Sequence, residues 1–217
     1  MAHATNQAPV HSTLLRYHFA PAETFHTELV LRTESRAHCG AGYGESESGS
    51  RCVIRTDVLQ TNEASTLVRA SMVESEGEGL NGDEQLLQIS SRGVVTPMSD
   101  GTAIPGSWYP LPEGYASAGT TWRCSGVPFQ STSAVSIFYT VERLEMRNGR
   151  EVAIISWNCP AVSTPNTNGR HEYRAWGTYV VDVVAGRLEE ARTVTRIRDV
   201  GPGWESEAIS QLDLRQI

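Results

Sequence analysis

The sequence predicts an all-β protein with one extended, curved antiparallel sheet of about ten strands. Polar and apolar residues alternate over long stretches such as 25–36, which places them on opposite faces of a strand. Turn sequences separate these stretches, and Asn148-Gly149 is the strongest hairpin signal among them. Residues 179–197 hold two β-rich runs joined at Ala185-Gly186 and show almost no helical pattern. An open half-barrel and a two-sheet sandwich both fit.

The chain also divides into two similar halves. Residues 52–98 and 135–198 each show a hairpin, a loop and a second hairpin, with Asn62 and Asn148 in matching turns. Gly93 and Gly186 match in the same way. We interpret this layout as a duplicated β unit.

The elements of the first half follow in order. Residues 1–13 are polar and are expected to be a flexible N-terminus, and 14–98 form a first β unit. The unit should contain a strand over 25–36, a Gly-rich loop over 40–50, a hairpin of 52–60 with 66–74, an acidic loop over 74–84, and a hairpin of 85–90 with 94–98.

The second half begins after a clear break. Residues 99–121 are dense in Gly and Pro and should form a connection rich in aromatic residues, followed by a second β unit over 122–200. That unit should contain a strand over 122–127, a hairpin of 135–145 with 151–157, an irregular loop over 160–170, and a strand pair of 172–184 with 188–198. Residues 201–217 are expected to be a tail, with one short helix in 204–214 that has Ala208, Ile209 and Leu212 on one side.

Composition excludes several functions. The chain has 217 residues, a formal net charge of -7 and a pI near 5.4, and no basic stripe suited to nucleic acid is visible. No apolar run approaches the ~20 residues of a membrane-spanning helix. All 18 basic residues are Arg, which excludes Schiff-base chemistry, a phosphate-loop lysine and a lysine general base.

The four cysteines are Cys39, Cys52, Cys124 and Cys159. An even count in a β-rich chain fits an exported protein with disulfides, and the preferred pairs are Cys39–Cys52 and Cys124–Cys159. The alternative is four reduced cysteines in a cytosolic protein. The first residues resemble no signal peptide, so an exported protein would have to be numbered here from its mature form.

Four segments resemble a family of uncharacterised exported bacterial proteins, many of them lipoproteins. They are residues 15–23, 111–122, 139–142 and 179–188. The chain departs from this family at Ala22, where a turn Gly is usual, and has no lipid-bearing Cys near its start. The resemblance implies an antiparallel all-β protein of the bacterial envelope without assigned chemistry.

No catalytic motif is found. The sequence lacks Gly-x-Ser-x-Gly, His-Glu-x-x-His and a strand-to-helix Gly-x-Gly-x-x-Gly step. His38 beside Cys39 has no zinc-ligand spacing, and the acidic loop over 74–84 does not match a calcium-binding loop. We therefore predict no catalytic residues, no metal and no cofactor.

The candidate ligand-binding residues are aromatic: Trp108, Tyr109, Tyr115, Trp122 and Tyr139. Exposed rings near the central break could stack on sugars or line an apolar groove. The alternative is that the rings cover the end of the sheet as part of its core.

The function expected from these features is non-enzymatic. We predict an exported binding or structural protein of the bacterial envelope that holds an apolar small molecule on the concave side of its sheet. The first alternative is a subunit or surface module that acts through a protein partner, using the loops around Trp108 and over 160–170. The second is a hydrolase of unrecognised type, which needs a pocket that unites His with carboxylates.

Overall fold

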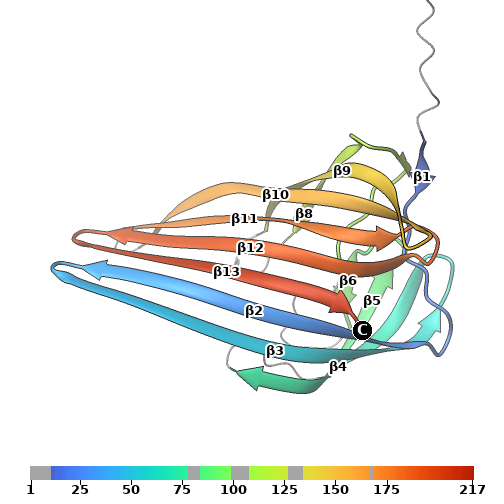
Figure 1. Cartoon of the computed structure of the whole chain (residues 1–217), viewed down its shortest axis with the longest axis horizontal. Coiled ribbons are helices and arrows are strands. Elements are labelled where there is room, and N and C mark those ends of the chain that lie inside the picture. The colour runs from blue at the N-terminus through green and yellow to red at the C-terminus, as the bar shows by residue number, and fades with distance from the viewer. Residues whose placement is uncertain (1–10, 78–83, 99–107, 127–133, 167–168) are drawn as a thin grey trace, which may run out of the picture.

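The computed structural model describes residues 11–77, 84–98, 108–126, 134–166 and 169–217, and all regular structure there is β (Figure 1). The strands are β1 (Thr13–Leu14), β2 (Thr24–Cys39), β3 (Gly42–Thr61), β4 (Ser65–Gly77), β5 (Gln85–Ser90), β6 (Val95–Pro97), β7 (Tyr115–Ala116), β8 (Thr121–Gly126), β9 (Val135–Arg147), β10 (Arg150–Asn166), β11 (Gly169–Asp182), β12 (Arg187–Gly201) and β13 (Trp204–Gln216). The all-β prediction is confirmed.

Eleven strands form one antiparallel sheet in the order β6-β5-β4-β3-β2-β13-β12-β11-β10-β9-β8, and β1 pairs with β7 in a separate small sheet. The large sheet is two meanders, β2–β6 and β8–β13, joined where β2 pairs with β13. Its edge strands β6 and β8 do not pair with each other, so the sheet is an open half-barrel. One connected ladder thus runs through both predicted units.

The long strands β2, β3 and β10–β13 extend beyond the short ones toward one end, where the molecule narrows (Figure 1). We call this end the narrow half and the end that contains β4–β6, β8 and β9 the wide half. The β2–β3 and β12–β13 hairpins turn at the narrow tip.

The predicted hairpin turns are present. Asn148 (φ 50°) and Gly149 (φ 78°) both have left-handed backbone conformations, which a two-residue turn of type I′ requires. Ala22 also has positive φ, 59°, at the position where the resembling family usually has glycine. A residue with a side chain therefore occupies a turn that favours glycine.

Three expected irregular segments are strands. The Gly-rich segment over 40–50 contains the first part of β3, and the segment over 160–170 continues β10 through a bulge between Cys159 and Val162 and then begins β11. The tail expected to hold a short helix forms β13, near the middle of the sheet. Its residues Ser206, Ala208 and Ser210 alternate with charged or larger residues, so the period of two prevails over the helical spacing.

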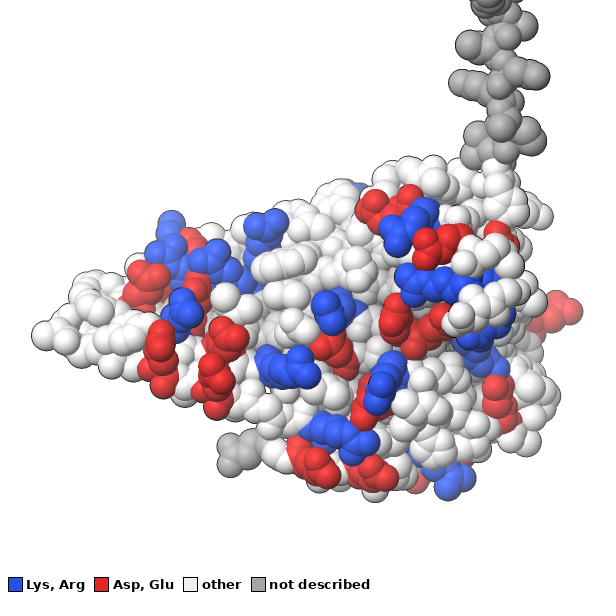
Figure 2. Space-filling view, viewed as in Figure 1, with Lys and Arg blue, Asp and Glu red and all other residues white. Residues whose placement is uncertain are grey.

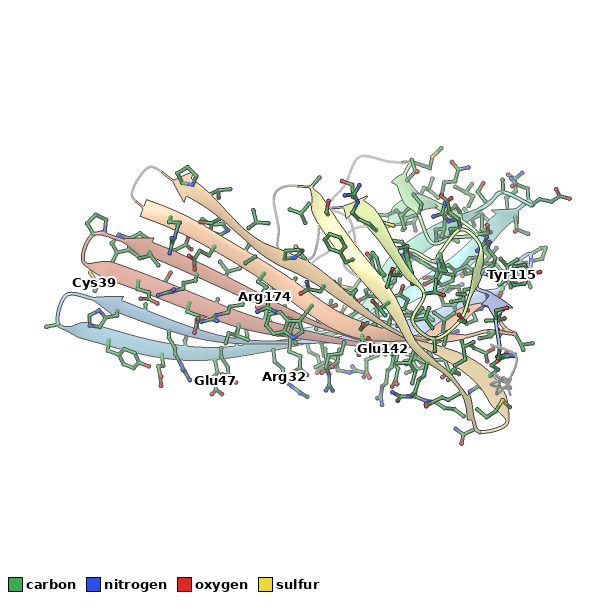
Figure 3. All side chains as sticks on the ribbon, turned by 90° about the horizontal axis from the view of Figure 1, so that it is seen from above. Arg32, Cys39, Glu47, Tyr115, Glu142 and Arg174 are labelled. Carbon is green, nitrogen blue, oxygen red and sulfur yellow. The ribbon has the colours of Figure 1, made fainter. Side chains whose placement is uncertain are left out.

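The two faces of the sheet differ in composition. Most buried apolar residues lie on the concave face, where Leu29 pairs with Leu214 on one side and Cys52 on the other. A small buried cluster of Val152, Ile154 and Val180 lies on the convex face. Charged residues lie mainly on the convex face, and Figure 3 shows Arg32 and Glu47 pointing outward from it. Strand alternation produces this separation and directs the core to one side.

Candidate functional site

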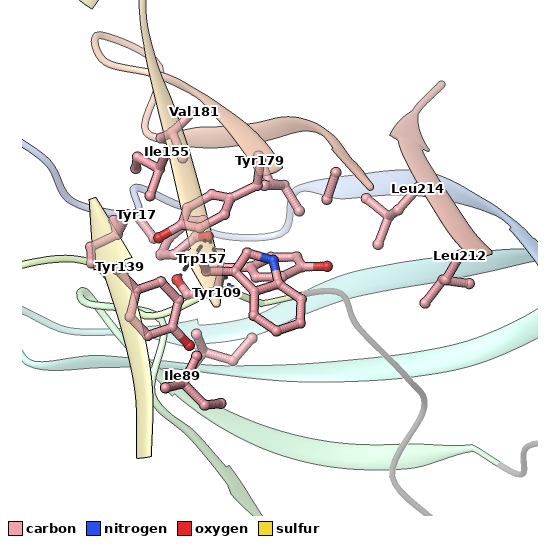
Figure 4. Packing of buried hydrophobic residues seen from close by; sticks show 14 of the residues in the cluster. Tyr17, Ile89, Tyr109, Tyr139, Ile155, Trp157, Tyr179, Val181, Leu212 and Leu214 are labelled. Atoms are coloured by element: carbon pink, nitrogen blue, oxygen red, sulfur yellow. Dashed lines mark hydrogen bonds between the residues drawn. The ribbon is translucent and has the colours of Figure 1, made fainter. Parts of the chain in front are cut away.

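The concave face of the wide half is covered by the chain itself. Residues 15–19 and 108–116, which we call the cover, cross this face and bury Leu15, Tyr17, Tyr109 and Leu111 against it. Tyr109 stacks on Tyr179 of β11, with ring centroids 4.7 Å apart (Figure 4). The wide half is therefore a packed core.

Two hairpin turns hold the cover in place. The amide of Tyr17 donates to the carbonyl of Ser91 (2.7 Å), and that of His18 donates to the carbonyl of Gly186 (3.1 Å). A Cβ atom at Gly93 would come within 2.5 Å of the Tyr109 carbonyl oxygen, and one at Gly186 within 2.6 Å of the Arg16 carbonyl oxygen. Both matching turns thus need glycine for the close approach of the cover.

Buried tyrosine hydroxyls join the cover to the sheet. Tyr179 donates to the carbonyl of Pro110 (2.8 Å), and the Tyr109 hydroxyl lies 3.0 Å from that of Thr193. Burial raises the pKa of Tyr109 to about 12 and holds the pKa of Tyr17 and Tyr179 well above its ordinary value. These hydroxyls stay protonated at neutral pH and act as structural hydrogen-bond donors.

Four of the five predicted ligand-binding residues belong to this core. Trp108 makes edge contacts with Tyr17, Phe19 and Phe25, at centroid distances of 5.6, 5.4 and 6.0 Å. Trp122 stacks on Tyr139 at 5.2 Å, and Tyr109 packs as described above. Tyr115 lies apart on β7 and is 72% exposed. The packing matches the alternative that rings cover the sheet, and a ligand-binding role for these five residues stays a prediction.

The same concave face continues into the narrow half, where none of the described residues covers it. There the concave positions of β2, β3 and β13 carry small side chains, apart from Trp204 near the tip. A hollow of about 420 Å³ is lined by Ser35, Ala37, Gly44, Ser46, Ile197, Asp199, Ser206 and Ala208, and also by Arg36, Glu45 and Glu207, which alternate with them along the strands. Register places Ser35 opposite Ser46 on one side and Ala208 on the other, and Ala208 opposite Ile197. We call this surface the narrow concave face.

Charge is nearly absent from this surface. We considered the described concave positions of β2, β3 and β10–β13 in the narrow half. Apart from Cys and Tyr, the ionisable side chains at these positions are His171 and Asp199. His171 Nδ1 lies 2.8 Å from Asp199 Oδ1, and both side chains are partly exposed at the outer end of the hollow. Thr33 and Ser210 hydroxyls hydrogen-bond across the floor at 2.9 Å.

The narrow concave face is not among the sites predicted from the sequence, because the sequence predicts a loop over 40–50 and a tail over 201–217. The signal is present in the sequence. Small uncharged residues alternate with charged or polar ones over 33–39, over 44–48 and over 205–208. Aligning these three runs shows one face of small side chains beside one of charges.

The convex face is covered with arginine–carboxylate pairs, and Figure 2 shows both signs of charge interspersed over it. In one line across five strands, Glu45, Arg36, Glu207, Arg198 and Glu172 occupy successive register positions with alternating sign. Arg36 lies 3.3 Å from Glu45, and Arg198 lies 3.6 Å from Glu172. The convex face is therefore strongly hydrated, unlike the narrow concave face.

All four cysteines are free thiols, so the expected disulfides are not formed in this structure. Cys39 pairs with Gly42 at the narrow tip, whereas Cys52 lies ten residues further along β3, about 33 Å away at strand rise. Cys124 on β8 and Cys159 on β10 are separated by β9, about 10 Å between Cα atoms. A disulfide needs Cα atoms within about 7 Å.

The described residues contain no group of three or more His, Cys, Asp or Glu side chains placed to hold a metal ion. They also contain no helix of the length and apolarity needed to cross a membrane. His171 hydrogen-bonds to Asp199.

No family model matches the chain, and no curated protein matches it in sequence. Solved structures with a distant likeness to this chain include the following two. A lipovitellin structure, described in terms of lipid–protein interactions, has a TM-score of 0.43 and 9% identity, over 92% of this chain and 25% of that one. An outer membrane lipoprotein-sorting protein domain from Vibrio parahaemolyticus has a TM-score of 0.17 and 10% identity, over 87% of this chain and 85% of the domain. The chain spans a quarter of the lipovitellin chain, and neither likeness carries a functional argument.

Proposed function

We propose that this protein is a non-catalytic binding protein that holds the apolar chain of an amphiphilic small molecule on its narrow concave face. The polar head of the ligand would lie near His171 and Asp199 at the outer end. The main support is that the concave side of this hollow, which no described residue covers, is formed mostly by small uncharged side chains in a protein rich in charge.

The size of the face suits an extended chain. Ala37 and Leu31 lie on the same face of β2 six residues apart, which corresponds to about 20 Å along the strand. Small side chains at Ser35 and Ala208 let a ligand approach the sheet closely. The inner end meets Leu31 and Leu212, both buried, so polarity falls along the hollow from the outer end toward the core. Such a gradient matches a molecule with one polar and one apolar end.

Burying this face under a hydrocarbon chain leaves few polar groups unsatisfied. The strands are hydrogen-bonded to both neighbours at Ser35, Ala208 and Ile197, so the face offers no free backbone groups in its middle. Thr33 and Ser210 satisfy each other. An extended peptide would find no ladder to join in the middle of this face, and Arg36, the one arginine among the described lining residues, pairs with Glu45. A hydrocarbon chain requires neither.

The proposal can be tested with a single substitution that fills the hollow with a large side chain. Ala208→Phe places a ring into it, whereas Ile209→Phe, one residue further on β13, places a ring on the convex face where Ile209 is already 39% exposed. In a fluorescence titration with a long-chain fatty acid probe, Ala208→Phe should weaken binding by about tenfold or more, and a tenfold loss corresponds to roughly 1.4 kcal/mol. Ile209→Phe should bind as the parent protein does.

Either of two results would reject the proposal. One is that the parent protein fails to bind fatty acid, lysophospholipid or diacyl lipid probes. The other is that the two phenylalanine variants bind equally while both remain folded. Cell fractionation of the native host tests the envelope location, which stays a prediction from the sequence.

A further inference from the structure

A second surface, on the opposite face of the sheet, differs from the charged lattice around it. Two adjacent lines of uncharged residues cross the convex face, one over β9–β12 and one over β9–β11, and the second line ends beside Arg192 of β12. The first line is Phe138, Asn158, Trp176 and Val194, and the second is Thr140, Ser156 and Thr178. We call these seven residues the convex neutral patch. They line a hollow of about 440 Å³.

The patch combines aromatic rings with free hydrogen-bonding groups. Phe138 is 46% exposed, and the Phe138 and Trp176 side chains lie on either side of Asn158, so their strands are about 10 Å apart. Among the described residues, the Asn158 amide and the Thr140 and Thr178 hydroxyls have no hydrogen-bond partner. These groups are available to a ligand.

Charged side chains lie at the rim of the patch, and some of them have partners. Arg192 Nε donates to Asp213 at 2.7 Å, and Glu142 accepts a short hydrogen bond from Ser156. Arg174 stacks over the Trp176 ring, with its guanidinium carbon 5.1 Å from the ring centroid. Arg123 lies beside Phe138 in the register, and neither Arg123 nor Arg174 forms an ion pair with a described carboxylate. The seven patch residues themselves are uncharged.

We propose that the convex neutral patch binds a neutral oligosaccharide. Sugar rings present apolar C–H faces, which pack on aromatic rings, and hydroxyl groups, which exchange hydrogen bonds with amides and hydroxyls. A purely apolar ligand would bury Asn158, Thr140 and Thr178 without partners. This site faces away from the narrow concave face and does not depend on the function proposed for it.

Short soluble β-linked oligosaccharides of glucose, N-acetylglucosamine and mannose are the probes, titrated into the full chain by calorimetry and by protein-observed NMR. At least one series should bind, and Trp176→Ala should weaken that binding by about tenfold or more. Asn158→Asp, which keeps the side-chain size and adds a charge beside the rings, should weaken it as well. Tyr43→Ala removes a ring that is 64% exposed elsewhere on the convex face and should leave binding unchanged.

The proposal is overturned if no series binds at millimolar concentration. It is also overturned if both patch variants, shown to be folded by circular dichroism, bind as the parent does. Concentration-dependent dimerisation of the parent that Trp176→Ala abolishes, without sugar binding, would identify the patch as a protein-contact surface and overturn it too. Ala208→Phe should bind the oligosaccharide normally, which separates this test from that of the concave site.

Discussion

The wide and narrow halves share long strands and one concave face, but the side chains on that face, and the segment that covers it, differ between the two halves. In the wide half, Leu29 on β2 is fully buried beneath the cover. Further along the same strand, Ser35 and Ala37 are partly or fully exposed and line a hollow. Side-chain size changes at the point where the described cover ends. Extended strands alone therefore do not produce a core, because the core also needs large apolar residues and a segment that covers them.

The comparison also shows what stabilises each half. The wide half buries a cluster of aromatic and aliphatic side chains, so hydrophobic burial dominates there. The narrow half relies on continuous backbone pairing between β3, β2, β13 and β12 and on the convex ion pairs. Exposed ion pairs contribute little each, so the narrow half should be the less stable region.

The largest expected difference concerns core truncation. Leu29→Ala should destabilise the protein by about 2–5 kcal/mol because it removes a fully buried side chain and leaves a cavity. Ile197→Ala, on the same face in the narrow half, should lose about 1 kcal/mol or less because Ile197 is only partly buried. Urea unfolding followed by tryptophan fluorescence measures both. Equal losses would remove the distinction between the halves.

A smaller effect should follow from loosening the cover. Tyr179→Phe keeps the ring stacked on Tyr109 but deletes the hydrogen bond to the Pro110 carbonyl, which should lower the free energy of unfolding by about 1–3 kcal/mol. Tyr115→Phe is the matched control, since Tyr115 is 72% exposed and its change should fall within about 0.5 kcal/mol. If the two variants were equally stable, the cover would not be held by this bond.

Acid should weaken the ion pairs of the convex face. Hydrogen bonds from Arg51 and Arg215 lower the pKa of Glu28, and the Glu28 side chain is only 10% exposed. Because its folded pKa lies below the unfolded value of about 4.3, its contribution is complete above that pH and is lost as the pH falls through the folded pKa. Glu28→Gln should therefore show a shallower loss of stability on acidification below about pH 4.3.

Denaturant titrations at several pH values measure that slope. Arg170 and Glu172 form a more exposed pair in the narrow half, and Glu172→Gln serves as the comparison with a smaller expected effect. Parallel curves for the parent protein and Glu28→Gln would show that this carboxylate does not contribute through its pKa.

The smallest expected effect on stability concerns the thiols, which should differ clearly in their rates of chemical labelling. Cys39 is exposed at the narrow tip, whereas Cys52 and Cys159 are buried in the wide half and near its boundary. Burial raises the pKa of the Cys52 and Cys159 thiols, which disfavours the reactive thiolate. A thiol reagent should label Cys39 first, and Cys39→Ser should remove the fast phase. A native mass showing disulfide formation would contradict the free-thiol arrangement.

Alternation and turn chemistry were enough to predict the all-β fold and most hairpins. The strand over 25–36 and the turn at Asn148-Gly149 are where local pattern and fold agree. Agreement fails in residues 42–50, 160–166 and 204–216, which are rich in Gly, Ser, Pro or helix-compatible residues. These segments are strands because each lies beside a neighbour that supplies a ladder, and sequence propensity does not contain that pairing.

The candidate site was predictable only in part. The sequence predicts a ligand on the concave side of the sheet, where one of the hollows lies, but it points to aromatic residues near residue 108. Aromatic rings are the strongest single-residue signal, yet the fold uses Trp108, Tyr109 and Tyr139 to fill its core. The narrow concave face consists of small residues that are unremarkable one by one. It becomes visible only when the register aligns them across strands.

The most direct test of the central claim uses methyl NMR with a fatty acid that carries a nitroxide on its chain. Ile197 and Ala208 point into the hollow, whereas Val194 and Ile209 lie on the convex face of the same two strands. The account predicts that the bound probe broadens the methyl signals of Ile197 and Ala208 and leaves those of Val194 and Ile209 sharp. Broadening that is confined to the convex methyl groups, or equal on both faces, would contradict it.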